Sequence, residues 1–122
     1  MIDWSLYKNF TREKFDCKET GENDMQPEAL ELFQRVRDMY GKPMIVLSGF
    51  RSVRHSEEIN KENPGSHAQG MAGDFKVRNG RERYELMKAA FACGAAGVGV
   101  ARSFIHIDAG HATMSRPAVW SY

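Results

Sequence analysis

Residues 97–108 read GVGVARSFIHID, two short runs of β-branched and aromatic residues around a polar connection. This pattern predicts two strands, over 97–100 and 104–108, joined as a hairpin. Side chains alternate between the faces of a strand, so His106 and Asp108 share one face. The isoleucines that flank His106 then point into the core. The stretch predicts an antiparallel sheet with polar side chains on one face.

Two more strands are expected before this hairpin. Residues 44–47 are a short apolar run after a proline, which predicts a buried strand. Residues 72–77 read AGDFKV and alternate, which places Asp74 and Lys76 on one face and apolar side chains on the other. The four segments together predict a small, mainly antiparallel sheet.

Helical patterns separate these strands. Pro27 suits a first helical turn, apolar residues recur at three- and four-residue steps over 27–40, and a glycine follows. A second helix is expected over 81–93, and the polar residues 53–62 are predicted to be helical too. The pattern indicates an α+β domain in which two or three helices pack against the sheet. The inner face of the 81–93 helix is expected to carry Tyr84, Met87, Ala90 and Phe91.

Length and composition restrict the class of protein. A chain of 122 residues is the size of one domain, so we expect a single domain over 1–122 and a monomer. The net charge of +1 argues against nucleic acid as a partner, and no apolar run is long enough for membrane insertion. The N-terminus does not resemble a signal peptide, which predicts synthesis in the cytoplasm. Cys17 and Cys93 lack a CxxC pattern, which favours two free thiols over a disulfide.

Three residues form a candidate metal site. His67 lies in a glycine-rich loop seven positions before Asp74, and His106 shares its strand face with Asp108. Two imidazole nitrogens and one carboxylate would leave a fourth tetrahedral position for water, as in catalytic zinc sites. The alternative is a loop histidine bonded to backbone and a strand carboxylate paired with Arg51 or Lys76.

Several ordered motifs resemble one family. Residues 66–74, SHAQGMAGD, resemble the S-x-H-x-x-G-x-A-x-D pattern of zinc peptidases of the D-Ala-D-Ala carboxypeptidase type, peptidase family M15, and every fixed letter from His67 onward is matched. Residues 48–52, SGFRS, are similar to the family's S-G-[YF]-R-S segment, and the 97–108 stretch looks like its G-[IV]-G and F-[VI]-H-[VIL]-D ending. Arg116 and Trp120 match a C-terminal R…W pair. The resemblance covers nearly the whole chain.

The resemblance implies a fold and a site. It implies a hedgehog-like α+β zinc peptidase fold, with Zn²⁺ bound by His67, Asp74 and His106. By the same resemblance Arg51 lies beside the metal and binds the substrate carbonyl or the developing oxyanion; the alternative is a structural salt bridge.

One position departs from the family pattern. Many members carry a Glu or Asp three residues before the last zinc histidine, where this chain has Ser103, whose hydroxyl is a poor proton acceptor. Asp108 then either acts as the catalytic base or orients a zinc histidine. Asp108 or His111 would protonate the leaving amine. The alternative for His111 is an ordinary surface residue without a role in the reaction. His55 is expected to be solvated.

The resemblance also suggests a function. It implies a peptidase that cuts peptidoglycan stem peptides or cross-links, either as a D-Ala-D-Ala carboxypeptidase or as an endolysin-like endopeptidase that cuts L-Ala-D-Glu. A short chain of this kind fits a phage enzyme that reaches the cell wall by release or as part of a virion. The alternatives are a zinc-binding module without hydrolysis and a phage structural protein that uses the fold as a scaffold.

Overall fold

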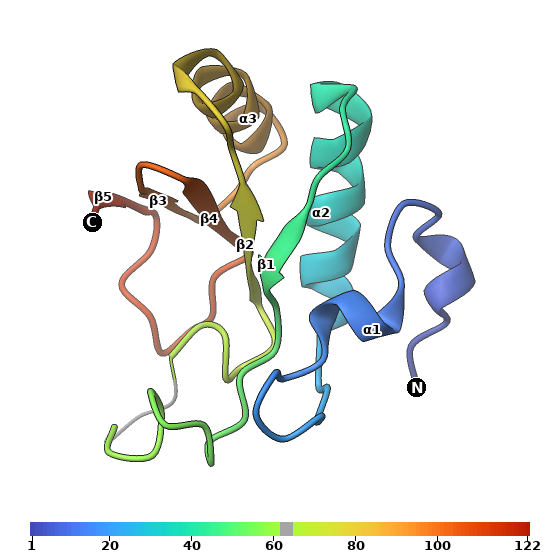
Figure 1. Cartoon of the computed structure of the whole chain (residues 1–122), viewed down its shortest axis with the longest axis vertical. Helices are drawn as coiled ribbons and strands as arrows, with labels where there is room; N and C mark the ends of the chain where they lie inside the picture. The colour runs from blue at the N-terminus through green and yellow to red at the C-terminus, as the bar shows by residue number, and fades with distance from the viewer. Residues whose placement is uncertain (62–64) are drawn as a thin grey trace.

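The computed structural model describes residues 1–61 and 65–122, and its centre is a five-stranded sheet in the order β1-β2-β4-β3-β5 (Figure 1). The first four strands in this order pair antiparallel, and β3 and β5 pair parallel. The sheet is therefore mixed but mainly antiparallel, and the predicted α+β class is confirmed. The strands are β1 (Val46–Ser48), β2 (Ala72–Lys76), β3 (Gly97–Val100), β4 (Phe104–Asp108) and β5 (Ala118–Ser121).

Helices cover one face of the sheet. The two long ones are α2 (Pro27–Tyr40) and α3 (Gly80–Ala92), and the N-terminal segment adds the short η1 (Trp4–Leu6) and α1 (Arg12–Phe15). They enclose a core that includes Phe75 of β2 and Ile105 and Ile107 of β4, all fully buried. Side-chain alternation then places Asp74, His106 and Asp108 on the opposite face, which we call the site face. Figure 1 shows that the β1–β2 and β4–β5 connections gather at one end of the sheet.

Several predicted elements are confirmed. The helix over 27–40 has the expected bounds, and Gly41 ends it in the left-handed conformation with φ 73°. The 97–108 hairpin and the strand that starts at Ala72 are also as expected. Among the residues that the structure describes, no helix combines the length and the apolar character that crossing a bilayer requires.

Other predictions are wrong. The expected buried strand at 44–47 is an edge strand over Val46–Ser48, with Ile45 and Leu47 exposed, because β1 pairs only with β2. Residues 53–61 form turns rather than a helix, and residue 62 of that prediction lies outside the described residues. The terminal strand β5 was not predicted at all.

The expected inner face of α3 is largely wrong. Tyr84 is 68% exposed and Phe91 is also exposed, whereas Leu86, Ala89 and Ala90 are buried. The helix packs against α2, and the small alanines allow the two backbones to approach closely. Of the predicted set, Ala90 is buried and Met87 is packed at the edge of the core.

Candidate metal centre

Strand register brings Asp74 and His106 together. The two residues face each other across β2 and β4, and His106 Nδ1 lies 3.1 Å from Asp74 Oδ1. Both side chains project from the site face, and both residues are buried. Residues far apart in the sequence thus meet because of one antiparallel pairing.

His67 completes a buried trio from outside the sheet. It lies in the turn that leads into β2, and its Nε2 is 3.3 Å from Asp74 Oδ1. Its Nδ1 lies 2.8 Å from the carbonyl oxygen of Gly49. A Cβ atom on Gly49 would lie 2.6 Å from Cα of Phe15, so only glycine allows the backbone to approach the core here. The SGFRS segment therefore positions an acceptor for the first histidine.

The arrangement fits a metal ion. One donor atom from each of His67, Asp74 and His106 lies within 4.8 Å of the others, and this is the only such cluster found among the described residues. Bonds of about 2.0–2.1 Å place two ligands of a tetrahedral zinc about 3.3 Å apart, close to the two oxygen–nitrogen distances observed. Each imidazole also contacts an oxygen through its other nitrogen, which leaves one nitrogen directed at the cluster. Nitrogen and oxygen donors of this kind suit zinc.

Asp108 lies on the other side of the His106 ring from Asp74. Its Oδ2 is 2.7 Å from His106 Nε2, and its carboxylate accepts hydrogen bonds from the Arg116 guanidinium and from the Gly110 N–H. Its side chain is 0% exposed. Burial alone would raise its pKa, but the bonds from His106 and Arg116 outweigh burial and lower the pKa to about 2. Asp108 is therefore a buried, ionised carboxylate in contact with a candidate metal ligand.

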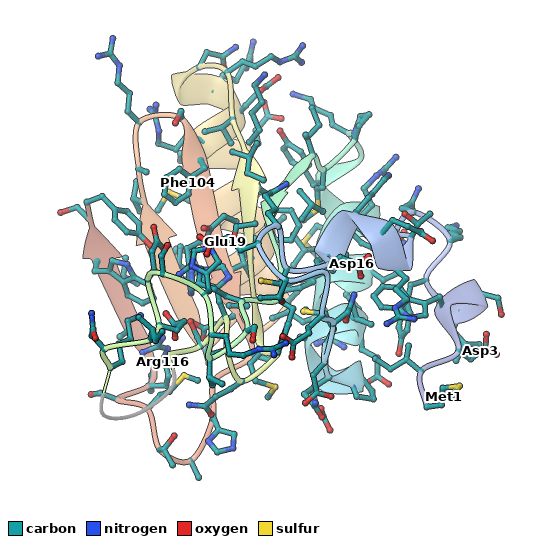
Figure 2. All side chains as sticks on the ribbon, turned by 60° about the horizontal axis from the view of Figure 1, so that its bottom comes forward. Met1, Asp3, Asp16, Glu19, Phe104 and Arg116 are labelled. Atoms are coloured by element: carbon teal, nitrogen blue, oxygen red, sulfur yellow. The ribbon has the colours of Figure 1, made fainter. Side chains whose placement is uncertain are left out.

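The glycines of the GVG segment make room for this contact. A Cβ atom on Gly97 would lie 2.3 Å from Asp108 Oδ2 and 2.5 Å from Arg116 Nε. A Cβ atom on Gly99 would lie 2.6 Å from the indole nitrogen of Trp120. Arg116, labelled in Figure 2, lies over the Trp120 ring, and that ring packs against His106 with centroids 4.9 Å apart. The motif residues thus form one packed unit behind His106.

Two members of the trio, Asp74 and His106, have pKa values shifted toward their charged forms. Burial raises the pKa of Asp74, but hydrogen bonds with His106 and His67 outweigh this and hold it well below its usual range. For His106, burial lowers the pKa, but Asp108 and Asp74 together raise it. The two carboxylates thus favour the protonated form of His106, and a metal ion that binds its Nδ1 must displace that proton.

A cavity of about 490 Å³ opens onto the trio. Arg51 lines it with a side chain only 17% exposed, and its backbone N–H donates to the carbonyl of His67 at 3.2 Å. Its guanidinium pairs with Glu57 at 3.1 Å and lies 3.8 Å from Glu58. The cavity also has an aromatic wall and a second cation; these lining residues are Phe104, Trp120, Tyr122 and Lys61.

The remaining residues singled out in the sequence lie elsewhere. Ser103 is exposed in the β3–β4 connection, and His111 is exposed with its Nδ1 3.0 Å from Thr113. His55, expected to be solvated, instead pairs with Glu19 at 3.0 Å with a side chain 16% exposed. Cys17 and Cys93 are free thiols.

Sequence reasoning missed Glu57 and Glu58 in the cavity wall. They lie in the polar segment 53–62 that was predicted to be helical, and no motif or spacing distinguishes them from other acidic residues of the chain. Their position depends on the turns over 53–61, which the sequence did not predict.

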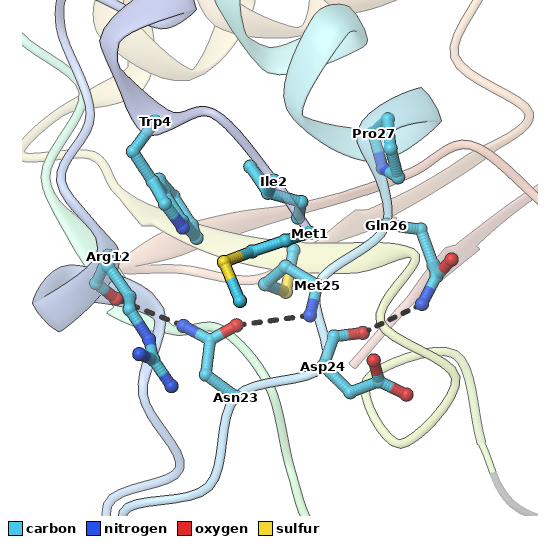
Figure 3. A pocket seen from close by; sticks show the side chains of 9 residues that line it. All are labelled: Met1, Ile2, Trp4, Arg12, Asn23, Asp24, Met25, Gln26 and Pro27. Atoms are coloured by element: carbon cyan, nitrogen blue, oxygen red, sulfur yellow. Dashed lines mark hydrogen bonds between the residues drawn. The ribbon is translucent and has the colours of Figure 1, made fainter.

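A second hollow of about 480 Å³ lies at the N-terminal segment (Figure 3). Apolar side chains of Ile2, Trp4 and Met25 line it. The Asn23 side chain bridges it by donating to the Arg12 carbonyl and accepting from the Met25 N–H. These polar atoms are engaged in holding the loop, and the hollow lacks a cluster of groups that could carry out chemistry.

Comparison with known proteins agrees with this site. The family model described as Peptidase M15 matches residues 6–108, which include all three residues of the trio. The chain therefore belongs to the peptidase M15 family, a family of zinc-dependent metallopeptidases. No curated protein matches the sequence.

Proposed function

We propose that the chain is a zinc-dependent peptidase that hydrolyses peptide bonds of peptidoglycan, in stem peptides or in their cross-links. The observation that carries the proposal is the buried trio of His67, Asp74 and His106 at the base of an open cavity, in a chain of the M15 family. Structural zinc sites are usually closed by four protein ligands, whereas three ligands beside a cavity leave room for substrate. The substrate class follows from the resemblance to D-Ala-D-Ala carboxypeptidases and endolysins.

The roles of the residues follow from their positions. His67 Nε2, His106 Nδ1 and an Asp74 carboxylate oxygen would hold the ion. Bound zinc supplies Lewis acidity and lowers the pKa of water toward about 7. Arg51, held in the cavity wall, binds the scissile carbonyl and stabilises the negative charge that develops on its oxygen.

Asp108 acts through His106 in this proposal. Its carboxylate accepts the Nε2–H of His106, which directs the Nδ1 lone pair toward the cluster. It is fully buried, engaged by Arg116, and on the opposite side of the imidazole ring from Asp74. Asp108 is therefore a positioning residue, and we do not assign it the proton transfer.

The test combines metal content with turnover. Purified protein is analysed for zinc and then given D-Ala-D-Ala and L-Ala-D-Glu stem peptides, and outer-membrane-stripped Gram-negative cells, with and without a chelator. We expect one zinc per chain and hydrolysis that stops on chelation and returns with added zinc. One zinc without turnover of any of these substrates would favour the non-hydrolytic zinc module, and a protein that binds no zinc would refute the proposal.

A further inference from the structure

A peptidase of this kind needs a group that accepts a proton from the attacking water, and Ser103 cannot supply it. We propose that Glu57 is this catalytic residue. The inference rests on the proposed peptidase function and adds to it a residue that no motif of the sequence assigns. It follows from comparing the carboxylates that reach the cavity among the described residues.

Of the residues that the structure describes, three with carboxylates line the cavity: Asp74, Glu57 and Glu58. Asp74 is bonded to both histidines and belongs to the metal trio. Glu58 has a side chain 1% exposed, pairs with Lys61 and accepts the Gly65 N–H at 3.0 Å. Its oxygens are occupied inside the wall, where they hold the turn together. Glu57 is the remaining carboxylate.

Glu57 has the exposure and the neighbours that a proton acceptor needs. Its side chain is 62% exposed, so it can reach water in the cavity, and its Oε2 lies 3.1 Å from Arg51 Nη1. The backbone N–H of Arg51 donates to the carbonyl of His67, and the side chains of Arg51 and Glu57 line the same cavity as the trio. A cation that binds the substrate carbonyl and a carboxylate that takes the proton are thus adjacent, as water addition to a carbonyl requires.

The step balances in atoms and charge. The oxygen of water forms a bond to the carbonyl carbon, while one of its protons moves to a Glu57 carboxylate oxygen. The carbon–nitrogen bond then breaks, and the proton held by Glu57 passes to the leaving amine. The second proton of the water leaves with the new carboxyl group. Glu57 ends ionised, as it began, and no other reactant is consumed.

The first test is Glu57→Gln, with Glu31→Gln as the matched control because Glu31 is exposed on α2 and lies outside the cavity lining. We expect kcat to fall by about 100-fold or more in Glu57→Gln, the loss typical of a missing general base. KM and zinc affinity should match the wild type, and the control should match it in all three quantities. An unchanged kcat would overturn the proposal. A raised KM with normal kcat would also overturn it, because Glu57 would then serve only to hold Arg51.

The second test does not depend on turnover. Acetohydroxamate binds zinc as its anion, and a neighbouring carboxylate accepts the proton that it loses. In calorimetry on the zinc-loaded protein, Glu57→Gln should bind it about tenfold more weakly than wild type and control, since a hydrogen bond to a charged group is lost. Equal binding would refute the role of Glu57 even if no substrate were hydrolysed. A wild type that binds zinc but hydrolyses nothing would refute the proposed function instead, so the two failures can be told apart.

Discussion

The contact between Asp108 and His106 can be tested with Asp108→Asn, a change that keeps the side chain's shape and removes its charge. In the wild type the carboxylate accepts from His106 Nε2, from Arg116 and from the Gly110 N–H. An amide has one oxygen and one NH₂ group, so its NH₂ must replace either Oδ2, which accepts from His106 and Arg116, or Oδ1, which accepts from Gly110 and Arg116. One of these donors therefore loses its acceptor inside the protein.

The size of the effect follows from burial. Asp108 is 0% exposed and the Arg116 side chain is 18% exposed, so the pair is largely removed from water. Breaking a buried pair costs about 3–5 kcal/mol, and we expect the lower end because Arg116 retains some access to solvent. Loss of a carboxylate behind a metal-binding histidine weakens metal affinity by about 10–100-fold, or about 1.4–2.7 kcal/mol. The variant should be both less stable without metal and a weaker binder of zinc.

Two measurements on the same protein check this prediction. Urea unfolding of the metal-free form gives the free energy of unfolding, and competition with a chromophoric chelator gives the zinc dissociation constant. Arg116→Gln is the companion variant because it leaves the Asp108 carboxylate on His106. It should lower stability with a smaller effect on zinc affinity than Asp108→Asn.

A different outcome would refute the positioning role. If Asp108→Asn bound zinc as tightly as the wild type and lost 100-fold or more in kcat, Asp108 would be the proton acceptor rather than a support for His106. Glu57→Gln would then retain its activity.

Four further predictions concern the metal, the packing behind it and pH. His67→Ala should lose zinc binding and hydrolysis together, whereas tight zinc binding in equilibrium dialysis would remove His67 from the ligand set. Free zinc at 100 times its dissociation constant should stabilise the wild type by about 2.7 kcal/mol. Chelation should remove this stabilisation and lower the Tm measured by calorimetry by roughly 10 °C. Gly97→Ala should cost about 1–3 kcal/mol in urea unfolding, because its Cβ would displace the Asp108–Arg116 pair; wild-type stability would refute the close contact. Hydrogen bonds from Arg78 lower the pKa of Glu82 from 4.5 to about 2, so its contribution is complete above pH 4.5 and lost toward pH 2, and Glu82→Gln should flatten stability over that range.

The sequence predicts the parts of the fold that obey strict periodicity. Helix α2 has a proline at its start, a glycine at its end and a regular apolar stripe between them, so three independent signals agree. The hairpin that carries His106 is similarly defined by alternation. The trio could be proposed because each of its members lies at such an element or at a glycine-rich turn beside one.

The segment over 53–61 shows why other parts could not be predicted. Its composition suits a helix, but its polar side chains bond to distant loops instead. Ser56 bonds to Glu19, and Arg54 bonds to Glu22. Side-chain bonds of this kind compete with the helical backbone, and their partners lie about thirty or more residues away. The position of Glu57 in the cavity wall depends on these tertiary contacts.

Strand register, rather than spacing along one strand, decides which side of the His106 imidazole ring would face a metal ion in the proposed site. Alternation predicts that His106 and Asp108 share one face of the sheet. It does not predict which ring nitrogen of His106 points toward the trio, because both nitrogens lie on that face. The β2–β4 pairing sets Asp74 directly opposite His106, and it sets Ala72, not a second ligand, opposite Asp108. On the other side of β4, Gly97 pairs with Asp108 and leaves space for Arg116. Asp74 therefore marks the side of the His106 ring that would face a metal ion in the proposed site. The space beside Gly97 places Asp108 and Arg116 on the opposite side of the ring.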